Sequence, residues 1–355
     1  MEKQKYPSIN GLRALSIIMV LFHHLNMQNH ILDNLVTLDW LSPLLFVLED
    51  GHLGVNMFFV ISGFLITSLL IQEEINTKSI SIKKFYIRRI LRIFPAYYFL
   101  LFVYFILQLF SIIQISTASW ITSITYTKYL NSQLDWPTAH FWSLSLEEFF
   151  YFFWPLCFVM GAKVRKNIII SLLIIVPIIR ISIDSAPSNL TNTLLVLSRI
   201  DAISIGCLFA IYKDTIIKRF SLHWTKLFYI SILSLFLLRY VPFITDNTPF
   251  SFIFLALGLT HGTIANFLIA LIMMYSVFGS RGAWFKILNL KVINYIGILS
   301  YSIYLWQQIF ISGSDNWATK FPQNIIFIFI AALLSYTFIE KPFLKLKSKF
   351  ITLKR

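Results

Sequence analysis

INGLRALSIIMVLFHHLNMQNH, residues 9–30, is an apolar stretch that also carries Arg13, His23 and His24. An α-helix of about 20 residues crosses the hydrocarbon core of a bilayer. A charged side chain near the centre of such a helix costs about 3 kcal/mol or more, so it faces a partner or a water-filled cavity. The stretch therefore predicts a membrane helix with one functional face.

The composition of the whole chain extends this prediction to all 355 residues. Hydrophobic residues make up 57%, charged residues only 13%, and the mean hydropathy is +0.73. This balance predicts an all-α polytopic membrane protein. Cys157 and Cys207 both lie within apolar runs, which indicates neither a disulfide framework nor a metal site. The net charge of +14 is spread between the apolar runs, so membrane topology explains it and we expect no nucleic-acid partner.

The order of apolar runs and basic connections predicts the topology. We expect about ten transmembrane helices, near residues 9–29, 54–72, 94–114, 143–161, 167–183, 201–213, 226–243, 262–279, 293–312 and 323–340. Lysine and arginine collect on alternate connections, so the positive-inside rule places these connections and both termini in the cytoplasm. Residues 1–345 then form a single membrane domain, and residues 346–355 form a short basic cytoplasmic tail.

Residues 115–142 form the longest connection on the outer side and are rich in serine, threonine and aromatic residues. Two interpretations are open. The segment is a plain solvated loop, or it is a surface that holds a sugar.

The spacing of Arg13 and His24 places both on one face of the first helix. Eleven positions at 3.6 residues per turn return to within roughly 20° of the same direction and advance about 16 Å. His23 points away from this line. Arg13 then lies near the cytoplasm and His24 lies deeper, toward the outer half of the membrane.

A second polar site lies in HFWSLSLEEFFYFFWP, residues 140–155, where Glu147 and Glu148 enter an aromatic helix. A carboxylate there needs a counter-ion or a proton, and an imidazole in the same cavity supplies a partner. A histidine oriented by a carboxylate is a general base for removing a hydroxyl proton. We therefore predict that a glutamate of this pair orients the histidine of the first helix.

A third feature is SIKKFYIRRILRIFPAYY, residues 81–98, which precedes the third apolar run. Lys84, Arg88 and Arg92 follow i, i+4, i+8 spacing, and Arg89 and Arg92 follow i, i+3 spacing, so one helical face is strongly cationic. Topology alone explains several of these charges. The same face also suits a ligand with several phosphates, because guanidinium groups bind phosphate oxygens bidentately.

Several other polar or small residues also lie in the apolar runs. Gly54 and Gly63 are expected to permit close helix packing. Arg199 and Asp201, at the outer end of the sixth run, form a local ion pair or contact a sugar. Tyr301 bonds to a neighbouring helix or contributes to a site.

These stretches together resemble the acyltransferase 3 family of integral membrane O-acyltransferases, which modify sugars of bacterial surface polysaccharides and related molecules. The resemblance covers residues 6–343. It depends on seven strings in order: GLRALSIIMVLFHH, GVNMFFVISGFLIT, FYIRRILRIFPAYY, HFWSLSLEEFFYFFWP, SRIDAISIG, GILSYSIYLW and FIEKPF.

The resemblance implies roles for particular residues. The family pattern of an arginine, ten residues and a histidine falls on Arg13 and His24, which implies that His24 is the catalytic base. The paired-arginine pattern falls on Arg89 and Arg92 and implies contacts with acyl-CoA. Glu147 matches the acidic residue after the Trp-Ser-Leu string and is the implied partner of the histidine.

Two positions depart from the family pattern. Gln307 stands where many members have a histidine after the SYSIYLW string, and Asn56 replaces a common acidic residue in the second run. Both departures bear on the identity of the acceptor more than on the basic chemistry.

The resemblance implies an enzyme of the bacterial inner membrane that moves an acyl group, most simply acetyl, from cytoplasmic acetyl-CoA to a hydroxyl of a surface polysaccharide or lipid-linked sugar. His24 either activates that hydroxyl or is itself transiently acylated. No metal is expected. The alternative is a secondary transporter or flippase that uses the same residues as a relay. We assign donor binding to Arg13, Arg88, Arg89 and Arg92, and acceptor binding to Trp142, Ser143, Arg199, Asp201 and Tyr301.

Overall fold

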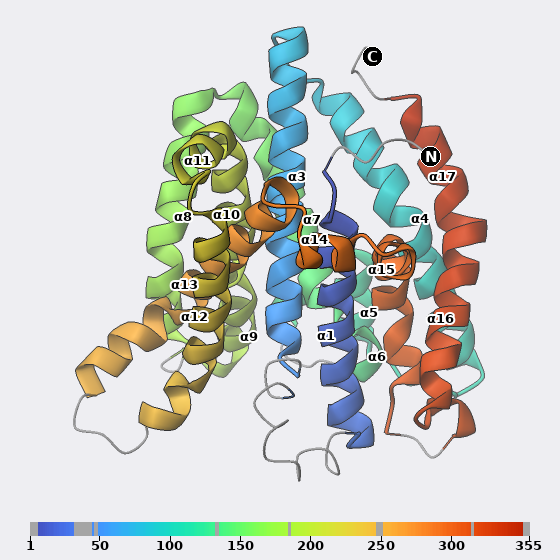
Figure 1. The fold of residues 1–355 in the computed structure, drawn as a ribbon. Coiled ribbons are helices and arrows are strands. Elements are labelled where there is room, and N and C mark those ends of the chain that lie inside the picture. Colours follow the sequence, from blue (N-terminus) through green and yellow to red (C-terminus); the bar gives the residue numbers. More distant parts are fainter. Residues whose placement is uncertain are drawn as a thin grey trace.

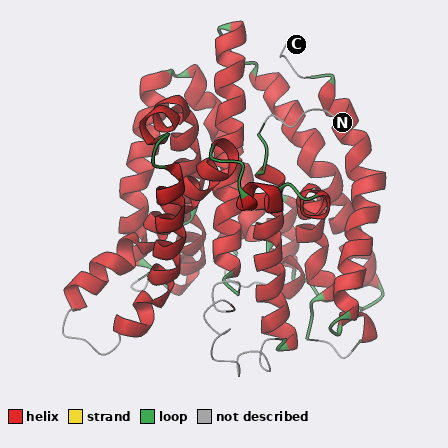
Figure 2. Cartoon of the chain, viewed as in Figure 1, coloured by secondary structure: helices red, strands yellow, loops and turns green. Residues whose placement is uncertain are grey.

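The structure is a computed structural model that describes residues 6–31, 45, 49–131, 135–183, 186–245, 251–313 and 316–350, with the backbone alone for 239–245, 251–261 and 348. Within these ranges the chain is helical and has no β-strand (Figure 2). The all-α prediction is therefore confirmed for the described part of the chain.

In chain order the elements are α1 (Ile9–Asn29), α3 (Gly51–Thr77), α4 (Ile82–Leu109), α5 (Thr117–Ile124), η1 (Lys128–Leu130), α6 (Trp136–Ala139), α7 (Phe141–Val159), α8 (Ala162–Ser182), α9 (Ser188–Leu197), α10 (Ile200–Ile211), α11 (Lys213–Phe220), α12 (Trp224–Thr245), α13 (Ser251–Phe278), α14 (Ala283–Leu288), α15 (Lys291–Phe310), η2 (Trp317–Thr319), α16 (Gln323–Ser335), the π-helical turn η3 (Tyr336–Glu340) and α17 (Lys341–Ser348).

Four helical segments among the described residues are long and apolar enough to cross a membrane: Gly51–Thr77, Ile82–Leu109, Ser188–Ile211 and Gln323–Lys347. A fifth is present if α11 and the first part of α12, bent by 104°, count as one span. Helices α1 and α7 have spanning length, with 21 and 19 residues, but carry buried polar groups that lower their hydropathy. The structure thus supports a multi-pass membrane protein, while ten spans and cytoplasmic termini stay predictions.

Helix α3 stands at the centre of the bundle (Figure 1). Helix α10 packs on one side of it, with α8 packed in turn against α10. Helix α1, which also packs against α15, packs on the other side. The contact between α3 and α10 is close, because a Cβ atom on Gly63 would lie 2.1 Å from the carbonyl oxygen of Ile203. A Cβ on Gly54 would lie 2.7 Å from the carbonyl oxygen of Ser16 in α1. The predicted packing role of Gly54 and Gly63 is confirmed.

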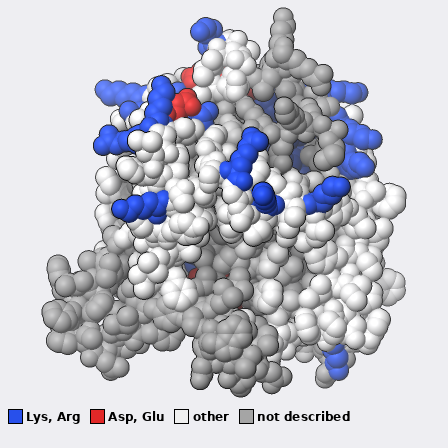
Figure 3. Space-filling model, viewed as in Figure 1, with Lys and Arg blue, Asp and Glu red and all other residues white. Residues whose placement is uncertain are grey.

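Three of the basic segments predicted to share one side of the membrane lie at one end of the bundle: the turn from α3 to α4, the turn from α7 to α8, and α17 (Figure 1). Helix α14, in the basic connection 281–291, and the first turn of α1 lie nearer to mid-height. Most lysine and arginine atoms on the face drawn in Figure 3 lie toward that end. His24 lies near the opposite end of α1.

The segment 115–142, predicted to lie on the outer side, is not a plain solvated loop in the part that the structure describes. It contains α5, η1 and α6, and these pack around Lys128, which is fully buried. Its Nζ donates to Ser119 Oγ at 2.9 Å and to Thr138 Oγ1 at 2.7 Å. Burial lowers the pKa of Lys128 to about 8, although the Asp135 carboxylate acts in the opposite direction.

Candidate active site

A cavity of about 100 Å³ lies between five long helices, α1, α3, α4, α7 and α15. Arg13 of α1, Arg89 and Arg92 of α4, and Glu147 of α7 line it, and Ser62 of α3 completes the polar wall. The i, i+3 spacing in α4 explains why both of its arginines face the same space. The sequence predicted these charged groups separately, and the fold brings them together.

The three guanidinium groups in this cavity have no hydrogen bond or ion pair to any part of the chain that the structure describes. Arg89 instead lies over the ring of Tyr151, with its Cζ atom 4.1 Å from the ring centroid. Buried charged donors are normally paired, because each one left without a partner is costly. The cluster therefore has the chemistry of an anion site.

Two carboxylates act electrostatically on this cluster. Glu147 lines the cavity, and Glu340, which accepts a hydrogen bond from Ser302, also acts on Arg13 and Arg92. Two carboxylates offset only part of three guanidinium charges. The site consequently keeps an excess of positive charge.

Arg88 does not face this cavity, although it was predicted to share donor binding with Arg89 and Arg92. Its Nη2 atom lies 2.8 Å from Oε2 of Glu73, and its Nη1 donates to the carbonyl oxygen of Phe350 at 3.1 Å. One residue along α4 turns a side chain by about 100°, which directs Arg88 toward α3 and α17. Arg88 therefore links α4 to the end of α3 and to the residues that follow α17.

His24 contacts Gln307 in place of the predicted partner Glu147. Its Nδ1 atom lies 3.1 Å from Oε1 of Gln307, and its ring meets Trp136 edge to face with centroids 5.7 Å apart. Both His24 and Glu147 are described, and no hydrogen bond or ion pair between them is present. Because an amide oxygen only accepts, Nδ1 carries the proton and Nε2 keeps its lone pair. The general-base role of His24 stays a prediction, now with Gln307 as its orienting group.

The face of α15 that holds Gln307 also reaches the arginine cavity. Tyr304, one turn earlier, lines the cavity, and its hydroxyl lies 2.6 Å from Ser143 Oγ. The same hydroxyl donates to the carbonyl oxygen of His140 at 2.9 Å. Tyr304, which lines the arginine cavity, and Gln307, which contacts His24, are therefore neighbours on one face of α15.

The five residues predicted to bind the acceptor are divided between three places. Ser143 and Tyr301 line the arginine cavity, and the Tyr301 hydroxyl donates to the carbonyl oxygen of Ile93 at 2.9 Å. Trp142 packs edge to face on Phe59. Arg199 lines a second cavity, while Asp201 is fully buried beside it.

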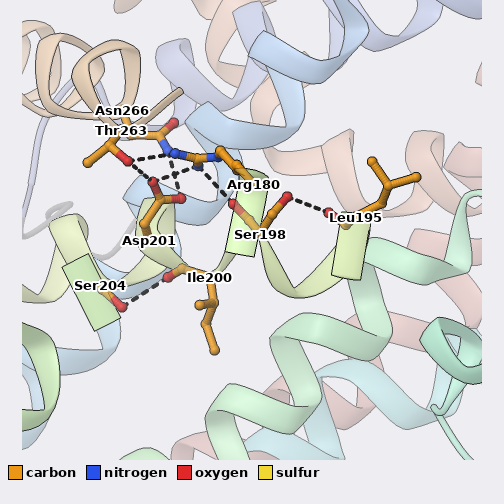
Figure 4. A network of polar contacts seen from close by, with 8 residues as sticks. All are labelled: Arg180, Leu195, Ser198, Ile200, Asp201, Ser204, Thr263 and Asn266. Atoms are coloured by element: carbon orange, nitrogen blue, oxygen red, sulfur yellow. Dashed lines mark hydrogen bonds and ion pairs between the residues drawn. The ribbon is translucent and has the colours of Figure 1, made fainter. Parts of the chain in front are cut away.

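Asp201 is held inside the protein by three side chains, as Figure 4 shows. Its Oδ2 lies 2.7 Å from Arg180 Nη2 and accepts from Thr263 Oγ1 at 2.6 Å, while its Oδ1 accepts from Asn266 Nδ2 at 3.1 Å. The predicted ion pair of Asp201 with Arg199 is replaced by a pair with Arg180. Sequence distance hid this partner, because Arg180 belongs to the preceding long helix α8.

Sequence reasoning missed the contributions of Gln307, Tyr304 and Glu340 to this region. Tyr304 and Gln307 are one turn apart in the same string, a spacing that places them on one face. Glu340 is a buried carboxylate within FIEKPF, and a carboxylate at such a position needs a partner. Both patterns are present in the sequence, but neither indicates which helix supplies the contacting residue.

Comparison with known proteins agrees with the resemblance in the sequence. Residues 6–339 match the family described as acyltransferase domain. The chain is 31% identical to a Staphylococcus aureus (strain COL) protein named "Putative O-acetyltransferase", and the match covers 97% of this chain and 58% of that protein. It is 30% identical to O-acetyltransferase OatA of S. aureus (strain NCTC 8325), covering 96% of this chain and 57% of the relative.

The chain thus spans a little over half the length of these curated relatives. No solved structure matches it. The family match covers almost the whole chain, from the first described residues to η3, and includes every helix that lines the arginine cavity. The chain belongs to the acyltransferase 3 family of membrane acyltransferases.

Proposed function

We propose that the chain is an O-acetyltransferase of the bacterial inner membrane, which moves an acetyl group from cytoplasmic acetyl-CoA to a hydroxyl of a surface polysaccharide or lipid-linked sugar. The observation that carries this proposal is the cavity that Arg13, Arg89 and Arg92 line together, with no hydrogen bond from these guanidinium groups to the part of the chain that the structure describes. The names of the relatives add the O-acetyl chemistry.

The donor fits the arginine cavity by charge. Coenzyme A carries a pyrophosphate and a further phosphate, and guanidinium groups bind such oxygens bidentately. A cavity of about 100 Å³ is smaller than a pocket for a whole drug-sized ligand. It therefore takes one part of the donor, while the rest of the nucleotide lies toward the basic end of α4.

The transfer step follows from the protonation of His24. Nε2 of His24 takes the proton of an acceptor hydroxyl, the hydroxyl oxygen bonds to the thioester carbonyl carbon, and the carbon–sulfur bond breaks. The coenzyme A thiolate then takes the proton from the imidazolium. In the other route the acetyl group passes through His24 itself. Glu147 acts in both routes on the arginine cluster and not on the imidazole.

The test is transfer of label from radiolabelled acetyl-CoA to soluble fragments of the host's surface glycan by the purified protein. We expect transfer by the wild type and a loss of about 10²- to 10⁴-fold in His24→Ala. His223→Ala, an exposed histidine at the other end of the bundle, is the matched control and keeps wild-type activity. Equal transfer by His24→Ala and wild type would remove the assigned base. No transfer by the wild type would contradict the proposed function and favour a transporter.

A further inference from the structure

A second cavity, of about 310 Å³, lies against a different face of α3. His52 and Asn56 of α3 line it together with Asp50, Ser198 and Arg199. The arginine cavity is lined by other residues of α3, among them Phe58, Ser62 and Leu65, which lie on a different side of the helix from Leu53 and Asn56. Helix α3 thus separates the two cavities.

One wall of the second cavity is held rigid by the Asp201 network (Figure 4). Arg180, which also lines this cavity, is paired with Asp201 and donates to Thr263 Oγ1 at 2.6 Å and to the carbonyl oxygen of Ser198 at 2.8 Å. These contacts use three of the five N–H donors of Arg180. They also fix the backbone at Ser198, directly before Arg199.

Two groups in this cavity lack partners in the described residues. The Arg199 guanidinium has no hydrogen bond or ion pair there. The side chain of Asn56 is only 7% exposed, and its Oδ1 accepts no hydrogen bond from the described residues. The cavity therefore offers several donors from Arg199 and a buried acceptor from Asn56. A buried polar atom left in this way indicates a ligand or ordered water.

A line of imidazole rings connects this cavity to the predicted base. The ring centroids of His52 and His23 are 5.8 Å apart, and those of His23 and His24 are 5.5 Å apart. The second cavity, which His52 lines, is therefore separated from His24 by two successive ring contacts.

We propose that the second cavity binds one sugar unit of the acceptor, with a hydroxyl that accepts from Arg199 and one that donates to Asn56 Oδ1. A hydroxyl group both donates and accepts, which matches the two unpartnered groups. The volume is at the lower end of the range for small-molecule pockets and suits one ring, not a whole oligosaccharide. This inference rests on the proposed function and locates the acceptor within it.

The test measures binding without turnover. Tritiated glycan fragments are dialysed to equilibrium against the purified His24→Ala protein, alone and combined with Arg199→Gln, Asn56→Leu or Arg89→Gln. Loss of a hydrogen bond to a charged group weakens binding by about tenfold or more. We expect this loss for Arg199→Gln, a smaller loss for Asn56→Leu, and unchanged glycan binding for Arg89→Gln, which changes the donor cavity.

Further variants separate binding from folding. Arg199→Lys keeps the charge and is expected to keep part of the affinity, and the thermal unfolding midpoint of each variant reports its folding. Unchanged glycan affinity in both Arg199→Gln and Asn56→Leu overturns the inference while leaving the proposed function in place. Equal loss in Arg89→Gln would place the glycan in the arginine cavity and also overturn it. Absence of label transfer by the wild type is the separate result that rejects the proposed function.

Discussion

Nδ1 of His24 lies 3.1 Å from the side-chain oxygen of Gln307, so an amide and not a carboxylate orients the predicted base. A glutamine fixes the tautomer of a neutral imidazole as well as a carboxylate does, because its oxygen accepts the Nδ1 proton. It does not neutralise an imidazolium. The Gln307 side chain is fully buried, and its Nε2 donor has no partner among the described residues.

Replacing Gln307 by leucine tests this relationship. Gln307→Leu removes one unpartnered donor, Gln307 Nε2, and leaves another, His24 Nδ1. Each costs about 1–3 kcal/mol, so the unfolding midpoint is expected to stay near the wild-type value. The rate constant kcat is expected to fall by about tenfold or more, because the imidazole loses its orienting bond. The KM for acetyl-CoA stays near the wild-type value. Acetyl transfer and thermal unfolding of the purified protein are the measurements.

The neighbouring glutamine provides a matched control. Gln308 is also buried, and neither its side-chain nitrogen nor its side-chain oxygen has a partner in the described residues. Gln308→Leu removes an equal volume and leaves His24 untouched, so kcat is expected to stay constant. In Gln307→Glu the new carboxylate favours the imidazolium, and the acidic limb of the kcat profile moves to higher pH. Equal kcat values in both leucine variants would show that Gln307 does not position the base.

Adjacent arginines in α4 are expected to have different roles. Arg89→Gln removes a guanidinium from the donor cavity and is expected to raise the KM for acetyl-CoA about tenfold or more. The side chains of Arg88 and Glu73, which form an ion pair, are only 16% and 6% exposed. Arg88→Gln breaks this pair and is expected to lower the free energy of unfolding by about 2 kcal/mol.

Steady-state kinetics and unfolding in detergent separate these effects. Arg88→Gln combined with Glu73→Gln is expected to cost less than the sum of the two single changes, because the pair is already broken by either one. A donor KM that rises equally in Arg88→Gln and Arg89→Gln would return Arg88 to the donor site.

The close contact between α3 and α10 depends on the absence of a side chain at Gly63. Gly63→Ala places a Cβ atom 2.1 Å from the Ile203 carbonyl oxygen, so the helices must separate. We expect a loss of about 1–3 kcal/mol in the free energy of unfolding. Gly282→Ala is the control, since its nearest neighbour, Ser280 Oγ, is 3.9 Å away. A wild-type unfolding midpoint for Gly63→Ala would contradict this packing.

The sequence predicts what lies on one helix better than what lies between helices. The spacings of Arg13 with His24 and of Arg89 with Arg92 follow from helical geometry, and the arginine cavity contains three of these four residues. The partner of His24 depends instead on the register of α1 against α15. That register is set by contacts such as Gly297, where a Cβ would lie 1.9 Å from the Asn10 carbonyl oxygen. No pattern within either helix specifies it, so Gln307 could not be chosen over Glu147.

Lys128, the buried lysine of segment 115–142, makes the stability of the fold depend on pH. Burial lowers the pKa of Lys128 to about 8 in the folded protein, below its ordinary value of 10.5, so between these values the unfolded chain binds more protons. Lys128 therefore destabilises the fold progressively as the pH falls from about 10.5 to about 8, and its effect is constant at lower pH. The measurement is the difference in thermal unfolding midpoint between wild type and Lys128→Met across this range. A difference that does not change with pH would mean that Lys128 titrates at its ordinary pKa, and thus that its amine is hydrated in the folded protein.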